Sequence, residues 1–171
     1  GVGHQPNSDK LNLEKVGVET DAKGIKVNEY LQTSNSKIYA MGDVLSKNQP
    51  HLTPVASFEG AYLGENLVKD EPQKIAYPAI PTIIFGTAKL AEVGHMSGEG
   101  LHTKGLDLSS WYTYKRINDP LAKLKVALNE KREIVGASTV SSVADEVINL
   151  INILIQQKMT LADVEKMIFT Y

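Results

Sequence analysis

The stretch IYAMGDV, residues 38–44, decides the fold, because an apolar run stops there at a Gly-Asp pair. Its apolar and β-branched residues predict a short strand over residues 38–41 that ends at Gly42. Glycine has no Cβ, so a ligand can approach the backbone closely at that point. The carboxylate of Asp43 can accept hydrogen bonds from the hydroxyl groups of a sugar or polyol. On this stretch alone two hypotheses stay open, a plain turn or one side of a ligand site.

A second stretch, LTPVA at residues 52–56, predicts the start of a helix. Thr53 suits the N-cap position, and Pro54 suits the first helical position. The N–H groups exposed at a helix start carry about half a positive charge, so they can hold an electron-rich ligand atom. A polyol acceptor next to such a helix start would form a cradle for a cofactor.

The helix expected over residues 54–68 places Ala56, Gly60 and Gly64 on one face. Each glycine inside a helix is destabilising by about 1 kcal/mol relative to alanine. We therefore expect this face to lie against something flat. Two neighbours remain open, namely the backbone of an adjacent element and the cofactor itself.

The composition is that of an ordinary globular protein, with 42% hydrophobic and 22% charged residues. The net charge of −2 gives no reason to expect nucleic acid or an anionic membrane as a partner. The absence of cysteine excludes disulfides, thiolate metal ligands and a redox dithiol within these residues. The sequence shows no signal peptide and no apolar run of about 18 residues, so we expect a cytoplasmic protein without a membrane span.

The histidines do not suggest a metal site, because no two of them have the spacing of metal ligands. They occur at His4, His51, His95 and His102. The sequence also lacks a nucleophile elbow and a glycine-rich phosphate loop. We therefore expect no metal and no self-contained active site in this chain.

The sequence pattern changes after the polar segment at residues 69–74, and we place the domain boundary at about residue 75. Residues 80–85 predict a strand, and Pro81 restricts it to an edge or its own start. Residues 97–104 contain two glycines and predict only a frayed turn.

Residues 121–128 and 134–137 predict an antiparallel hairpin, because apolar and polar residues alternate before a short polar link. A helix is expected over residues 143–157, where the central part is apolar except for two asparagines. Such a helix needs cover on more than one side, which favours a sheet together with a partner subunit. Thr160 and Asp163 predict the capped start of a final short helix.

Several motifs, in the same order along the chain, resemble those of the FAD-dependent pyridine nucleotide–disulfide oxidoreductases. This family includes glutathione reductase, dihydrolipoamide dehydrogenase and mercuric reductase. IYAMGDV followed by LTPVA is similar to the flavin-binding signature late in these enzymes. Residues 3–7, GHQPN, resemble the family's G-R-x-P-N, with His4 in place of the usual arginine. Residues 80–85 and 91–94 resemble the opening of its dimerisation domain, so the resemblance covers essentially the whole chain.

The resemblance implies an α+β fold in two parts. Residues 1–75 would be the end of a FAD-binding, Rossmann-like α/β domain. Residues 76–171 would be an α+β dimerisation domain with an antiparallel sheet and flanking helices, and they would form a homodimer. On this resemblance the chain is expected to be a C-terminal fragment of a longer flavoprotein.

In the family that this chain resembles, NADH or NADPH passes a hydride to FAD, and a cysteine pair carries the electrons to a disulfide or related acceptor. Asp43 matches the ligand of the flavin ribitol, and Thr53 matches the helix start beneath the flavin pyrimidine. The helix dipole there would stabilise negative charge on reduced flavin. The remaining FAD contacts and the cysteine pair would lie upstream, so the fragment alone is expected to be inactive and free of FAD. The implied cofactor-binding residues are Gly42, Asp43, Leu52, Thr53 and Ala56.

Members of the family usually end in an H-P-(T/S)-x-x-E motif, whose histidine acts as general acid–base in the partner subunit's site. Alignment through Ala162 and Asp163 places that histidine position on Tyr171. A tyrosine with an ordinary pKa of about 10 can donate a proton but is a poor base at neutral pH. Tyr171 is thus the candidate catalytic residue, and the change argues against glutathione or lipoamide as the acceptor.

Two alternative hypotheses remain open on the sequence. The chain could act only as a dimerisation or interaction module without a bound cofactor, or it could be an unrelated small enzyme. An interaction module would show no flavin absorbance, unlike a flavoprotein. An unrelated small enzyme would have to convert a substrate with these residues alone.

Overall fold

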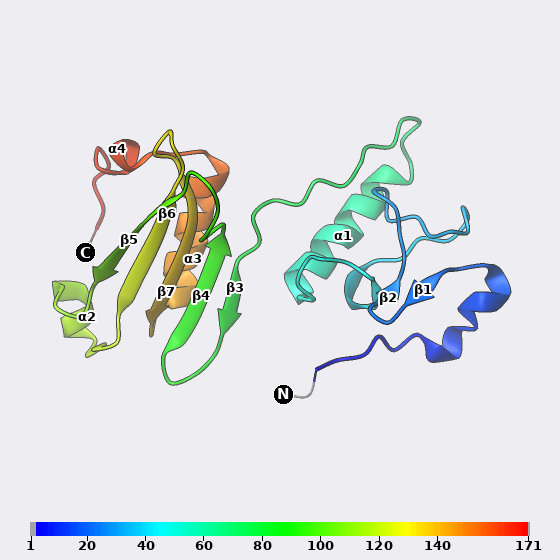
Figure 1. Cartoon of the computed structure of the whole chain (residues 1–171), viewed down its shortest axis with the longest axis horizontal. Coiled ribbons are helices and arrows are strands. Elements are labelled where there is room, and N and C mark those ends of the chain that lie inside the picture. Colours follow the sequence, from blue (N-terminus) through cyan, green and yellow to red (C-terminus); the bar gives the residue numbers. More distant parts are fainter. Residues whose placement is uncertain (1–2, 171) are drawn as a thin grey trace. The chain divides into compact units, whose positions relative to one another are not determined.

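The computed structural model describes residues 3–170, and the chain divides into two compact units between Ala76 and Tyr77 (Figure 1). Each unit has its own cluster of buried apolar side chains. None of the helices within residues 3–170 has the length and apolar character that a membrane span requires.

The first unit contains one long helix and otherwise short elements. Its core is formed by Leu31, Leu45 and Leu63, with Tyr62 and Ile75 packed against them. Two very short strands pair antiparallel, and three 3₁₀ turns complete the unit. The elements are η1 (Asp9–Leu11), η2 (Leu13–Val16), β1 (Thr20–Asp21), β2 (Gly24–Ile25), η3 (Gly42–Val44) and α1 (Thr53–Asn66).

Residues 38–41 do not form the expected strand. They are joined to the preceding segment by one antiparallel bridge, between Gln32 and Tyr39, and by a bond of 3.0 Å from the Ala40 N–H to the Leu31 carbonyl. Leu31 has a φ of 57°, in the left-handed region, so the partner segment cannot stay extended there. The ladder therefore stops after a single bridge.

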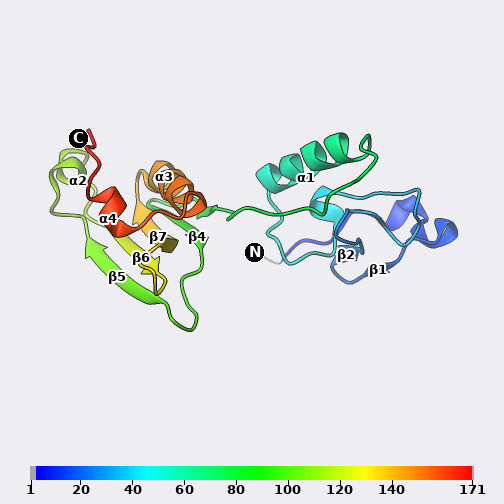
Figure 2. The ribbon, with the colours of Figure 1, turned by 90° about the horizontal axis from the view of Figure 1, so that it is seen from above.

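The second unit is an antiparallel sheet of five strands in the order β3-β4-β7-β6-β5 (Figure 1). The longest helix of this unit, α3, lies on one face of the sheet (Figure 2). This arrangement confirms the expected α+β fold with an antiparallel sheet and helices beside it. The elements are β3 (Thr82–Ile84), β4 (Lys89–Gly94), β5 (His102–Asp107), α2 (Tyr112–Arg116), β6 (Lys123–Leu128), β7 (Ile134–Ser141), α3 (Ala144–Gln156) and α4 (Leu161–Val164).

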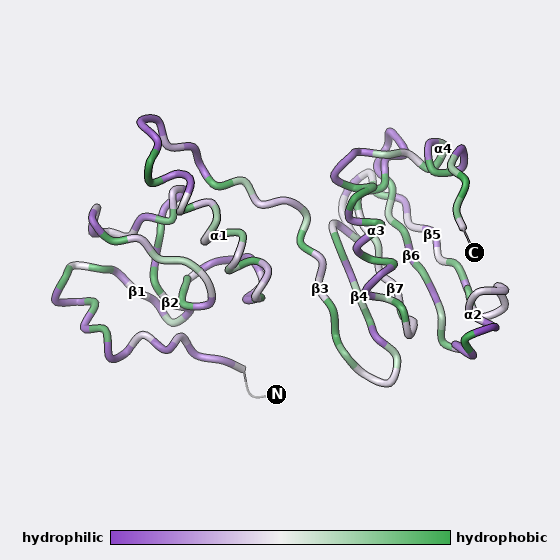
Figure 3. Tube along the Cα trace, turned by 180° about the vertical axis from the view of Figure 1, so that it is seen from behind, coloured by the Kyte–Doolittle hydropathy of each residue, from purple (hydrophilic) through white to green (hydrophobic). Residues whose placement is uncertain are grey.

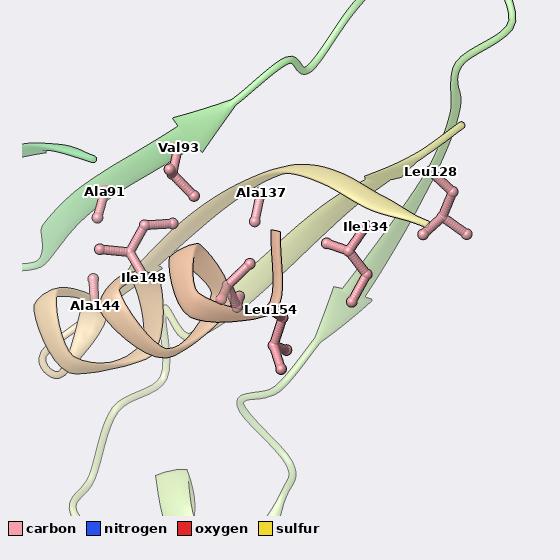
Figure 4. Close-up of a cluster of buried hydrophobic side chains, with 9 residues drawn as sticks. Ala91, Val93, Leu128, Ile134, Ala137, Ala144, Ile148 and Leu154 are labelled. Carbon is pink, nitrogen blue, oxygen red and sulfur yellow. The ribbon is translucent and has the colours of Figure 1, made fainter. Parts of the chain in front are cut away.

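Alternate residues of neighbouring strands point toward α3 and form the core of this unit (Figure 4). Val93 of β4 lies opposite Ala137 of β7, and both are buried. They pack on α3 residues that recur at helical spacing, including Ile148 and Leu154. The sheet face and the helix face therefore bury each other within one chain.

The apolar surface of α3 is only partly covered within the single chain. Ile148 and Ile151 are buried against the sheet, whereas Leu150 and Ile153 are 47% and 58% exposed. Figure 3 shows hydrophilic and hydrophobic stretches alternating along this helix. The single chain thus covers one face of α3 and leaves apolar side chains on the other.

Three elements of this unit, β4, β5 and α2, were not expected from the sequence. Residues 97–104 were expected to form a frayed turn, but β5 begins at His102 and pairs with β6 through Asp107. Nearly all of β5 is exposed, so it shows no alternation of apolar and polar residues. The short helix α2, which buries Tyr114, also carried no clear signal.

Candidate functional site

The Gly-Asp turn lies against the first turn of α1. Gly42 has a φ of +80°, a conformation that glycine adopts without steric cost, and a Cβ placed on it would lie 3.4 Å from the Cβ of Ala56. Asp43 follows within η3, and it is exposed. The structure therefore brings the predicted polyol acceptor and the predicted helix start together.

The helix start differs by one residue from the expectation. Leu52, with extended backbone angles of φ −133° and ψ 143°, is the N-cap, and its carbonyl accepts the Ala56 N–H at 3.0 Å. Thr53 is already inside the helix, so its assignment as N-cap was wrong. No side chain caps this end, and no acidic residue lies in the first turn. The N–H groups of Thr53 and Val55 therefore remain at a helix end with partial positive charge.

Asp43 lines a hollow of ≈ 580 Å³ in the first unit. The segment around His4, which resembles the family's G-R-x-P-N, lines the same hollow. The lining contains one carboxylate, that of Asp43, together with two lysines and two histidines, while Leu52, Thr53 and Ala56 lie outside it. The lining residues are His4, Gln5, Pro6, Asn7, Ala22, Lys23, Asp43, Val44, Lys47 and His51.

A buried ion pair lies directly behind the Gly-Asp turn. Glu59 of α1 is fully buried, and its Oε2 accepts the backbone N–H of Gly42 at 2.5 Å. Its Oε1 lies 2.6 Å from the ammonium of Lys47, whose side chain is 5% exposed. Sequence reasoning missed both residues. The available signal was a glutamate on a helix face that otherwise carries small and apolar residues.

The small-residue face of α1 meets a side chain rather than a flat backbone. A Cβ at Gly60 would lie 3.2 Å from the sulfur of Met41, so the helix packs closely on the residue before the Gly-Asp turn. Among the described residues, a Cβ built at Gly64 would meet no atom within 4 Å apart from its chain neighbours and the backbone of its own helix. Close packing inside this unit thus accounts for Gly60 but not for Gly64.

The loop that carries the turn is also fastened to the hairpin β1–β2. The hydroxyl of Ser46 donates to Asp21 Oδ2 at 2.6 Å, and the Lys23 N–H donates to Asp21 Oδ1 at 2.7 Å. These bonds, the Ser46 hydroxyl foremost, hold the pKa of Asp21 below its usual value. Asp21 therefore stays ionised and keeps this loop connected at neutral pH.

Two further expectations from the sequence were that the histidines form no metal site and that Tyr171 is the catalytic residue. Within residues 3–170, no three histidine, aspartate or glutamate side chains come together in a way that could hold a metal ion. Tyr171, the candidate catalytic residue, lies outside the described residues.

Comparison with known families identifies both parts of the chain. Residues 1–60 match the model described as pyridine nucleotide-disulphide oxidoreductase. Residues 80–171, more than half of the chain, match the model for the dimerisation domain of the same enzymes. The chain belongs to the pyridine nucleotide-disulphide oxidoreductase family.

The chain is similar to curated proteins of two different lengths. The chain is 40% identical to an uncharacterized 19.7 kDa protein in a mercuric resistance operon of Staphylococcus aureus, and the match covers 94% of each chain. It is 32% identical to a mercuric reductase of Staphylococcus aureus over 95% of this chain and 31% of that enzyme. It is 31% identical to a dihydrolipoyl dehydrogenase of Bacillus subtilis over 95% of this chain and 36% of that enzyme. The chain thus spans about a third of each of these two enzymes.

Two solved structures share the fold of this chain. The HOCl-induced flavoprotein disulfide reductase RclA from Escherichia coli superposes with a TM-score of 0.89 at 22% identity, over 100% of this chain and 41% of that one. LpdA from Mycobacterium tuberculosis gives a TM-score of 0.86 at 22% identity, over 99% of this chain and 38% of that one. At this identity the likeness establishes the fold only.

Proposed function

We propose that the chain is the C-terminal part of a flavoprotein disulfide reductase. Residues 1–75 would complete the FAD site, and residues 76–171 would form the homodimer interface. The intact cytoplasmic enzyme would pass electrons from NADH or NADPH through FAD and a cysteine pair to a disulfide or related oxidised acceptor. One observation carries the proposal: the exposed carboxylate of Asp43 lines a hollow, and the Gly-Asp turn that carries it packs on Ala56 in the uncapped first turn of α1.

The residues present fit the ribityl part of FAD. The exposed Asp43 carboxylate is an acceptor for polyol hydroxyl groups, and the buried Gly42, with its φ of +80°, packs the turn on Ala56 of α1. When bound, FAD supplies the two-electron chemistry that connects a nicotinamide with a disulfide. The role of Asp43 is to fix the sugar-like chain and thereby to orient the cofactor.

The start of α1 contributes electrostatics rather than a side chain. Thr53 would offer its backbone N–H to the cofactor between Leu52 and Ala56, whose own carbonyl and N–H are bonded to each other, and the helix dipole favours electron-rich atoms at this end. The lack of an acidic side chain in the first turn leaves this positive end uncompensated. We propose that it favours the reduced, negatively charged state of the cofactor.

The second unit supports the homodimer in two places. Leu150 and Ile153 leave apolar surface on α3, and Ile168 and Phe169 near the chain end are 101% and 52% exposed. An isologous contact across a two-fold axis is the commonest way to cover such surface. In that arrangement Tyr171 would reach the partner's site as a proton donor.

The test replaces the matching third of the Staphylococcus aureus mercuric reductase with this chain and measures bound flavin by absorbance. The substitution Asp43→Ala in this chimaera should weaken FAD binding about ten- to a hundredfold, because a charged acceptor for a hydroxyl is lost. The matched control, Asp9→Ala, removes an exposed carboxylate outside the hollow and should leave the affinity unchanged. Equal FAD affinity of the Asp43→Ala and unsubstituted chimaeras would remove Asp43 from the site.

The 19.7 kDa relative favours a second candidate function, a dimerisation or interaction module without cofactor, because the match with this chain covers 94% of its length. The purified chain distinguishes the two candidates when it is mixed with FAD. Since the other FAD contacts lie outside these residues in the proposed enzyme, we expect no stoichiometric flavin on the chain alone. A chimaera that also lacks flavin would favour the module.

A further inference from the structure

We propose that the buried pair of Lys47 and Glu59 positions the Gly42–Asp43 turn, and that Glu59 does so through its hydrogen bond to the Gly42 N–H. The consequence for flavin binding rests on the function proposed above. The positioning itself concerns only atoms of the first unit. Glu59 and Lys47 are therefore positioning residues rather than ligands.

The carboxylate of Glu59 contacts both ends of the loop from Gly42 to Lys47. Its Oε2 accepts the Gly42 N–H at 2.5 Å, and its Oε1 pairs with the Lys47 ammonium at 2.6 Å. Asp43 lies between these two points, with its side chain exposed at the hollow. The direction of the Asp43 carboxylate thus follows from how the loop is held against α1.

Stability alone does not explain a charged pair at this position. Glu59 is 0% exposed, and removing two charged groups from water is unfavourable in free energy. Well-packed apolar residues of similar size would not carry this desolvation penalty. An apolar pair could not accept a hydrogen bond, whereas the carboxylate of Glu59 accepts the backbone N–H of Gly42, a residue in the left-handed conformation. Hydrogen bonds to charged groups are shorter and stronger than neutral ones. The pair therefore fixes the orientation of the Gly42–Asp43 turn, in addition to filling space in the core.

The experiment compares two double variants of the 171-residue chain. Lys47→Met with Glu59→Gln removes both charges but keeps an oxygen that can accept the Gly42 N–H. Lys47→Met with Glu59→Leu also removes both charges and keeps the volume, but it offers no acceptor. Urea unfolding measures the stability of each variant, and NMR hydrogen exchange measures the protection of the Gly42 amide.

Neither double variant leaves an unpaired buried charge, so both should stay folded, with the leucine variant less stable and unfolding at a lower urea concentration because the buried Gly42 N–H loses its acceptor. The Gly42 amide should stay protected in the glutamine variant and exchange at least about tenfold faster in the leucine variant. Glu59→Asp, which keeps the charge but shortens the side chain, should show the same loss of protection. The control Lys74→Met breaks an ion pair that is 60% and 65% exposed in the same unit, and Gly42 should not respond to it.

Equal protection of Gly42 in the two double variants, or in Glu59→Asp and the unsubstituted chain, would overturn the proposal. The mercuric reductase chimaera adds the flavin readout, where the leucine variant should lower FAD affinity about tenfold relative to the glutamine variant. A chimaera that binds no FAD even without these substitutions counts against the flavin function. In that case the exchange measurement still decides whether the pair positions the turn.

Discussion

The unit from Tyr77 onward repeats one kind of contact many times, whereas the unit up to Ala76 depends on a few individual contacts. In the second unit β6 pairs with β5 and β7 along its length, and α3 covers the sheet. In the first unit, short strands, isolated bridges and one buried ion pair hold the loops on α1. In the second unit, many similar contacts share the stability among many residues. The candidate site lies in the first unit, where individual contacts determine the backbone conformation. The difference suggests that the two units respond differently to the same kind of substitution.

The largest effect is expected for truncation of the second core. Ile148→Ala removes a side chain that is 2% exposed and should lower the free energy of unfolding of this unit by about 2–5 kcal/mol. The only tryptophan, Trp111, lies in this unit, so its fluorescence reports the transition during urea unfolding.

The matching substitution in the first unit, Leu63→Ala, should leave the tryptophan transition unchanged if the units unfold separately. Ile117→Ala, at an exposed isoleucine outside α3, serves as the surface control in the second unit and should change stability by less than about 0.5 kcal/mol. A shift of the tryptophan transition by Leu63→Ala as large as that by Ile148→Ala would show that the two units unfold together.

A smaller effect is expected at the exposed face of α3. Ile153→Asp should weaken the proposed homodimer by about 2 kcal/mol, or about thirtyfold, because it introduces an unpaired charge into apolar surface. Ile151 is not suitable for this test, because it is buried against the sheet and a charge there would unfold the unit. Ile117→Asp, at another exposed isoleucine, is the control.

Sedimentation over a range of concentrations measures this association. The homodimer proposal requires the unsubstituted chain to exceed 18.7 kDa in a concentration-dependent manner. A mass of 18.7 kDa at every concentration would contradict the dimer before any variant is made.

The smallest effect is expected from acid. Lys89 donates to both carboxylate oxygens of Asp145 at 2.8 Å, and this contact lowers the pKa of Asp145 below its usual 3.8. A carboxyl whose pKa is lower in the folded state adds stability above its unfolded pKa and loses it as the pH falls through the folded value. The unfolding midpoint of the second unit should therefore depend less on pH below about 4 in Asp145→Asn.

The measurement is urea unfolding at several pH values, followed by Trp111 fluorescence. Asp70→Asn, an exposed substitution in the other unit, is the control. The same pH dependence in Asp145→Asn and the unsubstituted chain would show that this surface pair contributes nothing measurable. Added salt should reduce the effect, because the pair is partly exposed to solvent.

Elements with a strong local pattern could be predicted from the sequence. The alternation before residue 128 predicted the hairpin of β6 and β7, and the helical pattern predicted α3. Thr160 and Asp163 form the expected capping box at α4, with the Asp163 N–H donating to the Thr160 hydroxyl at 3.2 Å. These elements depend on neighbours in sequence, so a local pattern contains most of the information.

Other features depend on contacts that no local pattern encodes. Residues 38–41 have the composition of a strand, but the left-handed backbone of Leu31 ends the pairing. β5 is recognisable only from its pairing with β6. Gly42 and Asp43 were identified from their motif, whereas Lys47 and Glu59 lie 12 residues apart and meet only after α1 has packed. The residues that hold the candidate site in place were thus harder to predict from the sequence than the site residues Gly42 and Asp43.

Both outer strands of the five-stranded sheet are poor templates for adding a further strand. β3 is only three residues long and directly follows Pro81, which lacks a backbone N–H. At the opposite end, β5 carries Lys104 and Gly105, and such polar or flexible positions disfavour edge-to-edge growth into aggregates. Copies of this chain should therefore meet through side chains on their faces, and the sheet should end within each subunit rather than continue from one molecule into the next.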